Sequence, residues 1–160
     1  MKKHKFSCKR GGLTIRGNLF QPEGENLPIA ILSHGFMANQ STMKGYAQAA
    51  AELGFAAFTY DFCGGCLWGR SDGKTTDMSV LTEVEDLKAV IAYASSLPFT
   101  DESRIVLIGA SQGGFVSALT AAQMGNKIER LVLFYPALCI PDDARKGQMM
   151  FAKFDPAEIP

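Results

Sequence analysis

Four short apolar runs, separated by stretches of helical periodicity, constrain the fold of this chain more than any other feature. The runs are PIAILSH at 28–34, FAAFTYD at 55–61, RIVLIG at 104–109 and ERLVLFYP at 129–136. Continuous apolar runs of this length are typical of strands covered on both faces, as in parallel sheets. Their alternation with helices predicts an α/β fold, mostly a parallel sheet with helices on both faces.

Three segments between and after these runs are predicted to be helices, at 43–54, 79–98 and 112–125. The helix predicted at 79–98 has the clearest helical period of apolar residues. Glu83, Asp86 and Lys88 do not lie on the line that these apolar residues form. The positions on that line are Val80, Val84, Leu87, Ile91 and Ala94. Ahead of the first apolar run, residues 5–22 predict a β-hairpin that turns at Gly11 and Gly12.

Size and charge exclude several classes of function. The chain has 160 residues, which predicts one domain, and its 16 Lys and Arg balance its 16 Asp and Glu. This balance argues against a nucleic-acid or membrane partner. The basic start MKKHKFSCKR lacks the apolar stretch of a signal peptide, so we expect a cytoplasmic protein or one that has lost its targeting segment. Four cysteines are then expected to be free thiols.

The sequence GASQGG at 109–114 has the chemistry of a nucleophile turn. Gly109, Ser111 and Gly113 form a G-x-S-x-G pattern between a predicted buried strand and a predicted helix. A serine on such a sharp turn adopts strained backbone angles, and side chains two residues either side would collide with the turn. The alternative is that the glycines only allow close packing of strand and helix. The strand-turn-helix context favours a catalytic Ser111.

A second loop could supply a hydrogen-bond donor for the oxyanion of an acyl-transfer reaction. His34, Gly35 and Phe36 follow the first parallel strand, and Gly35 allows a close approach of the backbone. We expect the backbone N–H groups of Phe36 and Gln112 to form the oxyanion hole. His34 is expected to belong to the hydrogen-bonded frame of this loop rather than to act as the base.

These two motifs resemble those of the α/β-hydrolase superfamily. The stretch from Asp61 to Ile91, with its D-F-x-G, S-D-G-K and M-S-V-L-T-E-V-E-D segments, resembles bacterial feruloyl (cinnamoyl) esterase-like hydrolases. The resemblance implies a serine carboxylesterase that acts on a small-molecule ester through an acyl-enzyme, with no cofactor and no metal. It also implies a triad in the order Ser, Asp, His.

This chain has no Asp or His at the positions that the resemblance implies for the rest of the triad. No histidine follows His34, and Asp142, Asp143 and Asp155 do not stand where the family has its acid. We therefore expect the chain to be the N-terminal part of one hydrolase domain, truncated before the last strands, with residues from about 137 to 160 starting a lid. Loss of the triad histidine costs on the order of 10⁶ in turnover, so this part alone should be nearly inactive.

Other constellations in the long loop at 61–78 carry weaker predictions. Cys63 and Cys66 have redox or half-zinc spacing, but incidental thiols in a glycine-rich loop explain them more simply. Asp61 directly follows an inner strand and is a candidate for the substrate pocket. Asp72 is expected to serve the turn. Trp68 could contact an aromatic acyl group, or it could be buried against the core.

Two other functions and one association remain open. The same fold could serve as a peptidase or thioesterase, or as a non-catalytic binding or assembly module. Without the neighbouring strand that the family has, residues 130–135 would form an exposed apolar edge, which predicts self-association through this strand.

Overall fold

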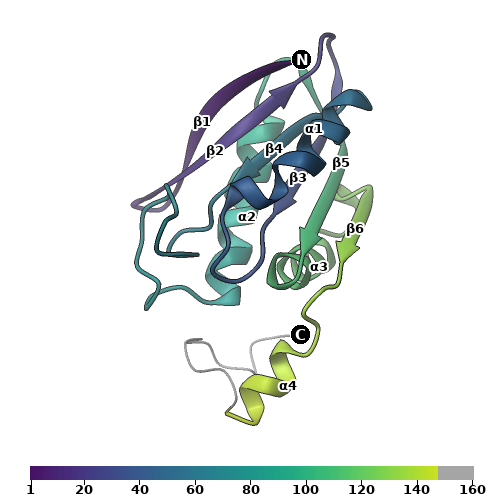
Figure 1. The fold of residues 1–160 in the computed structure, drawn as a ribbon. Helices are drawn as coiled ribbons and strands as arrows, with labels where there is room; N and C mark the ends of the chain where they lie inside the picture. The colour runs from purple at the N-terminus through teal and green to yellow at the C-terminus, as the bar shows by residue number, and fades with distance from the viewer. Residues whose placement is uncertain (148–160) are drawn as a thin grey trace.

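The fold is described from a computed structural model, which describes residues 1–147. Figure 1 shows a twisted sheet of six strands in the order β1-β2-β4-β3-β5-β6. The strands are β1 (Lys2–Arg10), β2 (Leu13–Gln21), β3 (Leu27–Ser33), β4 (Ala56–Tyr60), β5 (Thr100–Ala110) and β6 (Arg130–Phe134). The helices are η1 (Gln40–Met43), α1 (Lys44–Glu52), α2 (Val80–Ser95), α3 (Gln112–Met124), η2 (Gly125–Lys127) and α4 (Ile140–Arg145).

The pairing of the strands confirms the predicted hairpin and the mostly parallel sheet. β1 pairs with β2 in antiparallel register across a turn at Gly11, whose φ of 54° is left-handed. β2 also pairs with β4 in antiparallel register, whereas β4, β3, β5 and β6 run parallel to one another. The four predicted apolar runs are therefore the four parallel strands, and their carboxyl ends meet at one edge of the sheet, where ligands bind in open α/β folds.

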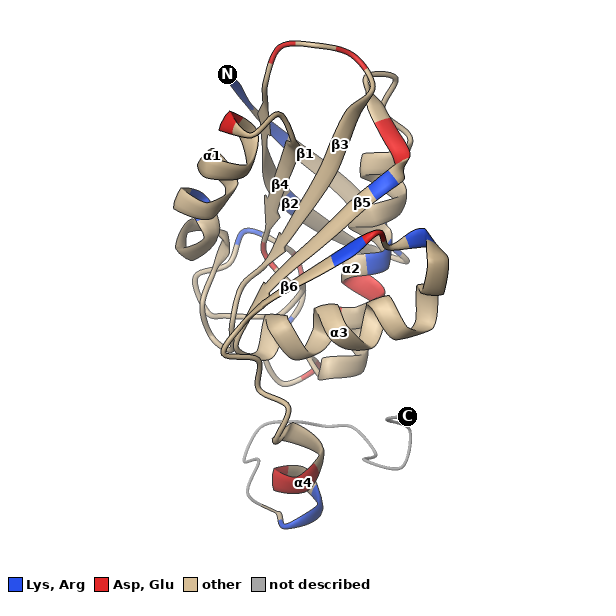
Figure 2. Ribbon diagram, turned by 90° about the vertical axis from the view of Figure 1, so that its right-hand side faces the viewer, with Lys and Arg blue, Asp and Glu red and all other residues tan. Residues whose placement is uncertain are grey.

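Helices cover both faces of the sheet, as the apolar runs predict. Figure 2 shows α1 on one side of the sheet and α2 and α3 on the other. Successive residues of β3 point to opposite faces. Ile29 and Ile31 join the core beneath α2 and α3, whereas Ala30 and Leu32 join the smaller core beneath α1. A strand buried on both faces needs apolar side chains at every position, and this explains the unbroken run in the sequence.

Helix α2 buries two acidic residues in addition to its apolar line. Glu83 and Asp86 fall off the apolar line of the sequence, yet both are buried in the structure. The helix begins with a capping box between Ser79 and Thr82. The carboxylates of Glu83 and Asp86 have partners in distant parts of the chain, which are described below with the site. Helical periodicity cannot reveal such partners.

Strand β6 forms one edge of the sheet and is poorly covered. Figure 2 places β6 at the front, beside α3, with charged residues at the start of the strand and none along the rest of it or on α3. Leu131 and Val132 point to opposite faces of the strand and are 38% and 40% exposed. Beyond β6 the chain continues into α4, and residues 148–160, the greater part of the predicted lid region, lie outside the described residues.

Two further expectations bear on the class of protein. Within residues 1–147, no helix is long and apolar enough to cross a membrane. The same part of the chain contains no cluster of three or more His, Cys, Asp or Glu side chains that could hold a metal ion. All four cysteines are free thiols there, and burial raises the pKa of Cys63 to about 12. A thiol that resists ionisation is a poor redox nucleophile.

Candidate functional site

Ser111 stands on a sharp turn between the end of β5 and the start of α3. Its backbone angles, φ 54° and ψ −123°, are left-handed, a conformation that few non-glycine residues adopt. The turn is fixed by hydrogen bonds on both sides. The N–H of Ser111 donates to the Phe134 carbonyl at 3.0 Å, and the Ser111 carbonyl accepts from Gly114 at 3.0 Å and from Ala137 at 2.9 Å. Strain of this kind persists only where the surroundings hold it.

The two glycines of the G-x-S-x-G pattern are required by crowding around this turn. A Cβ atom at Gly109 would overlap the Gly113 carbonyl oxygen, and one at Gly113 would overlap the carbonyl oxygens of Ser33 and His34. A side chain at Gly113 would therefore push the elbow away from the end of β3, and one at Gly109 would push α3 away from β5. Crowding around the turn therefore explains the spacing of the two glycines, as the sequence predicts.

The loop after β3 lies directly against Ser111. A Cβ atom added to Gly35 would stand 3.1 Å from the Ser111 Cβ and 3.6 Å from its Oγ. No backbone carbonyl within residues 1–147 accepts a hydrogen bond from the N–H of Phe36 or of Gln112. Both donors that the sequence nominates for the oxyanion hole are thus free to bind an anion, and Gln112 is the first residue of α3, where the helix dipole favours negative charge.

His34 is fully engaged with the backbone around it. Its Nδ1 lies 2.8 Å from the Gly35 carbonyl oxygen, and its Nε2 accepts a hydrogen bond of 3.2 Å from the Phe62 N–H. These two contacts place the proton on Nδ1. Burial lowers the pKa of the imidazole, so the ring is neutral and has no free nitrogen. This geometry fits the frame role and leaves no lone pair with which His34 could activate Ser111.

Glu83 of α2 supports the elbow through a hydrogen bond to Gln112, a role that no pattern in the sequence predicts. Its Oε2 accepts a hydrogen bond of 2.7 Å from the Gln112 side-chain amide, and both side chains are buried. Burial raises the pKa of Glu83 to about 8 despite this hydrogen bond, so the carboxyl group is mostly protonated at neutral pH. The contact fixes the side chain of the residue whose N–H is one of the two expected oxyanion donors.

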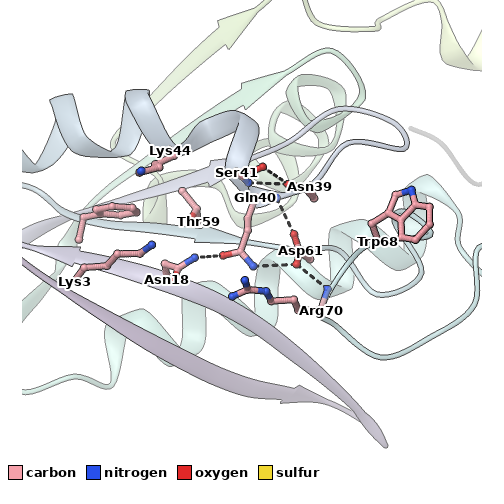
Figure 3. A pocket seen from close by; sticks show the side chains of 11 residues that line it. Lys3, Asn18, Asn39, Gln40, Ser41, Lys44, Thr59, Asp61, Trp68 and Arg70 are labelled. Atoms are coloured by element: carbon pink, nitrogen blue, oxygen red, sulfur yellow. Dashed lines mark hydrogen bonds between the residues drawn. The ribbon is translucent and has the colours of Figure 1, made fainter.

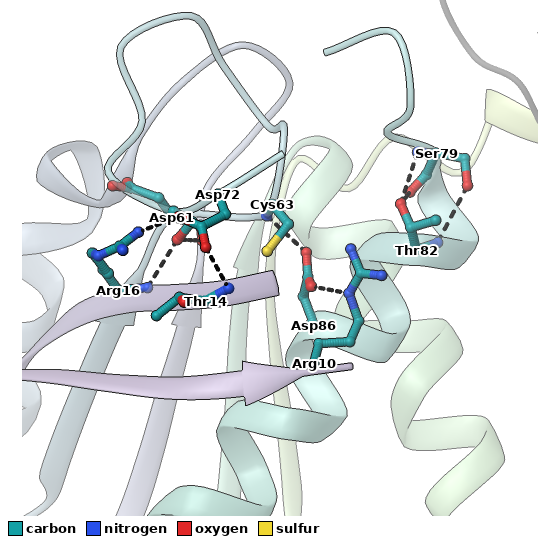
Figure 4. A network of polar contacts seen from close by, with 10 residues as sticks. Arg10, Thr14, Arg16, Asp61, Cys63, Asp72, Ser79, Thr82 and Asp86 are labelled. Atoms are coloured by element: carbon teal, nitrogen blue, oxygen red, sulfur yellow. Dashed lines mark hydrogen bonds and ion pairs between the residues drawn. The ribbon is translucent and has the colours of Figure 1, made fainter. Parts of the chain in front are cut away.

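The loop at 61–79 is tied to β2 and α2 by buried or partly buried carboxylates (Figure 4). Asp86 forms an ion pair with Arg10 of β1 and accepts a hydrogen bond of 2.8 Å from the Cys63 N–H. Asp72 accepts from the Thr14 N–H at 2.9 Å and pairs with Arg16 at 2.6 Å. The Arg16 guanidinium and the Thr14 N–H lower the pKa of Asp72 to about 2. Asp72 therefore has the turn-anchoring role that was expected.

Asp61 is also engaged in holding loops together. Its carboxylate accepts from the Gln40 N–H at 2.7 Å, the Gln40 amide at 2.9 Å and the Arg70 N–H at 2.8 Å. Asp61 lines a hollow near β2 and α1, and its suggested contact with substrate stays a prediction. Trp68 is 84% exposed, so the alternative that it is buried against the core is wrong.

Within residues 1–147, neither an imidazole nor a carboxylate forms a hydrogen bond to Ser111. His4 is exposed on β1, and Asp142 lies on α4, where it pairs with Arg145 at 3.2 Å. Asp155 lies outside the described residues. The structure therefore brings together Ser111, the two expected donors and their supports, and residues 1–147 place no base beside them.

Comparisons with known proteins agree on one family. A family described as serine aminopeptidase, S33, matches residues 24–158. Est1E from Butyrivibrio proteoclasticus, solved with ferulic acid bound, superposes with a TM-score of 0.83 at 31% identity, over 97% of this chain and 62% of that one. The monoacylglycerol lipase of Mycolicibacterium smegmatis is 29% identical over 148 residues, which are 89% of this chain and 50% of the lipase.

An uncharacterized 31.7 kDa protein of Escherichia coli, from the traX-finO intergenic region, is 36% identical over 104 residues, or 64% of this chain and 35% of that protein. The chain therefore spans between about a third and a half of the length of these curated relatives.

Proposed function

Because the chain belongs to the serine aminopeptidase S33 family of α/β-hydrolases, we propose that it carries the nucleophile and the oxyanion hole of a serine ester hydrolase. The observation that carries this proposal is the left-handed backbone of Ser111 with the Gly35 loop packed against its side chain. The likeness to Est1E over nearly the whole chain confirms the predicted fold and the resemblance to feruloyl esterases.

In the proposed reaction, the Ser111 hydroxyl attacks the carbonyl carbon of an ester. The negative charge that develops on the carbonyl oxygen is stabilised by the N–H groups of Phe36 and Gln112 and by the N-terminus of α3. Collapse of the tetrahedral intermediate breaks the bond to the alkoxy oxygen, which takes up the proton that Ser111 loses and leaves as the alcohol. Water then hydrolyses the acyl-enzyme, which releases the acid and returns the proton to Ser111. Glu83 holds Gln112 in place through these steps.

For the acyl group, we propose an aromatic acid of the feruloyl type. Est1E was solved with ferulic acid bound, and large apolar side chains are exposed along the loops that follow the parallel strands. Phe36 and Met37 stand on the oxyanion loop, and Trp68 stands on the 61–79 loop. The description of the family as an aminopeptidase keeps a peptide substrate as the alternative.

A fluorophosphonate probe with intact-mass readout tests the nucleophile. We expect slow addition of one phosphonyl group per chain to the wild type and none to Ser111→Ala. Ser7→Ala, which removes an exposed hydroxyl on β1, is the matched control and should label like the wild type. A folded wild type that stays unlabelled, or equal labelling of Ser111→Ala, would refute the nucleophile and favour the non-catalytic module.

Aryl-ester, thioester and anilide substrates then separate the classes of bond. A site with donors but no base keeps on the order of 10³–10⁴ over water, so turnover by this chain should be slow but should depend on Ser111. Faster release from an aryl ferulate than from the matching thioester or anilide supports the esterase. Preference for the anilide would instead support a peptidase.

We also propose that β6 pairs with the β6 of a second copy. An antiparallel pair centred on Val132 would set Leu131 opposite Leu133 and Arg130 opposite Phe134, with no like charges facing each other. The neighbouring helix α3 carries no Lys, Arg, Asp or Glu, so the surface beside this edge presents no repulsion. An uncovered edge strand whose one charged residue, Arg130, faces an apolar residue in the pair is a template for such pairing.

A further inference from the structure

We propose that a hollow on the α1 side of the sheet is a binding site for a small organic anion, one that carries a carboxylate or phosphate group. The hollow lies between β2, β4, η1 and the 61–79 loop, and its volume is about 280 Å³ (Figure 3). Its lining contains neither Ser111 nor any residue of 34–36. The inference therefore does not depend on the proposed hydrolase activity.

Three cationic side chains line the hollow, and none of them takes part in an ion pair within residues 1–147. They are Lys3 of β1, Lys44 at the start of α1 and Arg70 of the loop. Six other Lys and Arg residues in that part of the chain do form ion pairs. Unpaired cations around one concave surface raise the local concentration of anions.

Asp61, the one carboxylate in the lining, does not neutralise these cations. Both of its oxygens face inward to hydrogen-bond donors, from Gln40 on one side and from the Arg70 N–H on the other. Figure 3 shows Asp61 below Gln40, with the side chain of Lys44 on the opposite wall of the hollow. With three cations against this one carboxylate, the charge around the hollow is net positive.

The floor of the hollow is rigid and offers a free hydroxyl. Asn18 donates to the Gln40 side chain, which in turn donates to Asp61, so these three buried groups form one connected network. Thr59 is 1% exposed and lines the hollow, and within the described part of the chain its hydroxyl has no hydrogen-bond partner. Because the Thr59 hydroxyl oxygen is not fully enclosed, a ligand in the hollow can reach it. Thr59 can donate to an anionic oxygen there.

Aromatic rings in the lining favour an anion with an organic body. Phe20 forms part of the wall, and the Lys3 ammonium lies 5.5 Å from the centre of its ring. Trp68 stands at the rim of the hollow. The volume corresponds to roughly nine water molecules, which suits an aryl carboxylate or aryl phosphate better than a bare inorganic ion.

Calorimetric titration of the whole chain with phenyl phosphate, benzoate and inorganic phosphate tests the site and separates the two anionic groups. Benzyl alcohol serves as the neutral analogue. We expect saturable binding of at least one aryl anion, weaker binding of inorganic phosphate, and none of benzyl alcohol. Removing one cation should weaken binding about fivefold, as expected for one partly exposed charge pair, so Lys3→Gln and Lys44→Gln are the test variants.

Lys2→Gln is the matched control, because Lys2 and Lys3 are neighbours on β1 and point to opposite faces of the sheet. It should bind like the wild type, whereas Thr59→Val, which keeps the shape and removes the hydroxyl, should bind more weakly. Circular dichroism checks that each variant is folded. The site is refuted if no anion binds saturably, if benzyl alcohol binds as well as benzoate, or if Lys2→Gln weakens binding as much as Lys3→Gln.

Discussion

The two edges of the sheet, the β1–β2 hairpin at one end and β6 at the other, are stabilised in different ways. On the hairpin side, formed by β1, β2, the 61–79 loop and α2, carboxylates of Asp61, Asp72 and Asp86 link segments far apart in the chain. On the β6 side, apolar side chains are exposed and the strand is attached mainly through its backbone pairing with β5. The hairpin side therefore has a geometry fixed by the chain itself, while the β6 side offers an open edge.

The largest effect should come from removing the ion pair that closes the hairpin side. Asp86→Ala leaves the Arg10 guanidinium and the Cys63 N–H without their buried partner. We expect a loss of roughly 3 kcal/mol in the free energy of unfolding, measured by urea denaturation. Glu85→Ala, which removes the neighbouring exposed carboxylate, is the control and should change little. Equal losses in the two variants would mean that the buried pair is not what holds this side.

Glu83 links α2 to α3 by accepting a hydrogen bond from Gln112, and it should make stability depend on pH. Its carboxyl has a pKa of about 8 in the folded chain against an ordinary value of 4.5, so between these values the folded state holds a proton that the unfolded state has lost. Stability from this group is complete below the lower value and is lost as the pH rises through the upper one.

From pH 6 to pH 8 this loss should be about 2 kcal/mol in the wild type. It should be missing in Glu83→Gln, because an amide at this position cannot ionise. Urea denaturation at the two pH values measures the difference, and Glu85→Gln serves as the control. Identical pH profiles for the wild type and Glu83→Gln would show that Glu83 does not titrate in this range.

A charged residue in the middle of β6 should weaken self-association through this edge, with a smaller effect than the two changes above. Val132→Lys places a lysine in the middle of β6, and two such lysines would face each other in the proposed pair. We expect self-association to weaken roughly tenfold, equivalent to about 1.4 kcal/mol, in light-scattering or sedimentation measurements. Leu138→Lys, an exposed apolar position beyond the strand, should associate like the wild type. A wild type that stays monomeric at micromolar concentration would contradict the proposed pairing.

The same contrast explains what could be predicted from the sequence. The four parallel strands and the elbow are encoded locally, because burial on both faces demands continuous apolar runs and crowding demands Gly109 and Gly113. The roles of Glu83 and Asp86 are not encoded locally, since their partners Gln112 and Arg10 are 29 and 76 residues away. Periodicity identifies an acidic residue off the apolar line, but only the path of the loop and hairpin decides whether that residue is exposed.

The backbone of Ser111 has a consequence for how this position can vary. Glycine adopts a left-handed conformation without the steric penalty that a Cβ atom brings, and that penalty is on the order of 1 kcal/mol. A selection that rewarded heat resistance alone would therefore favour glycine at 111 and discard the hydroxyl. A serine at this position is therefore explained by a role of its hydroxyl group other than stabilising the fold.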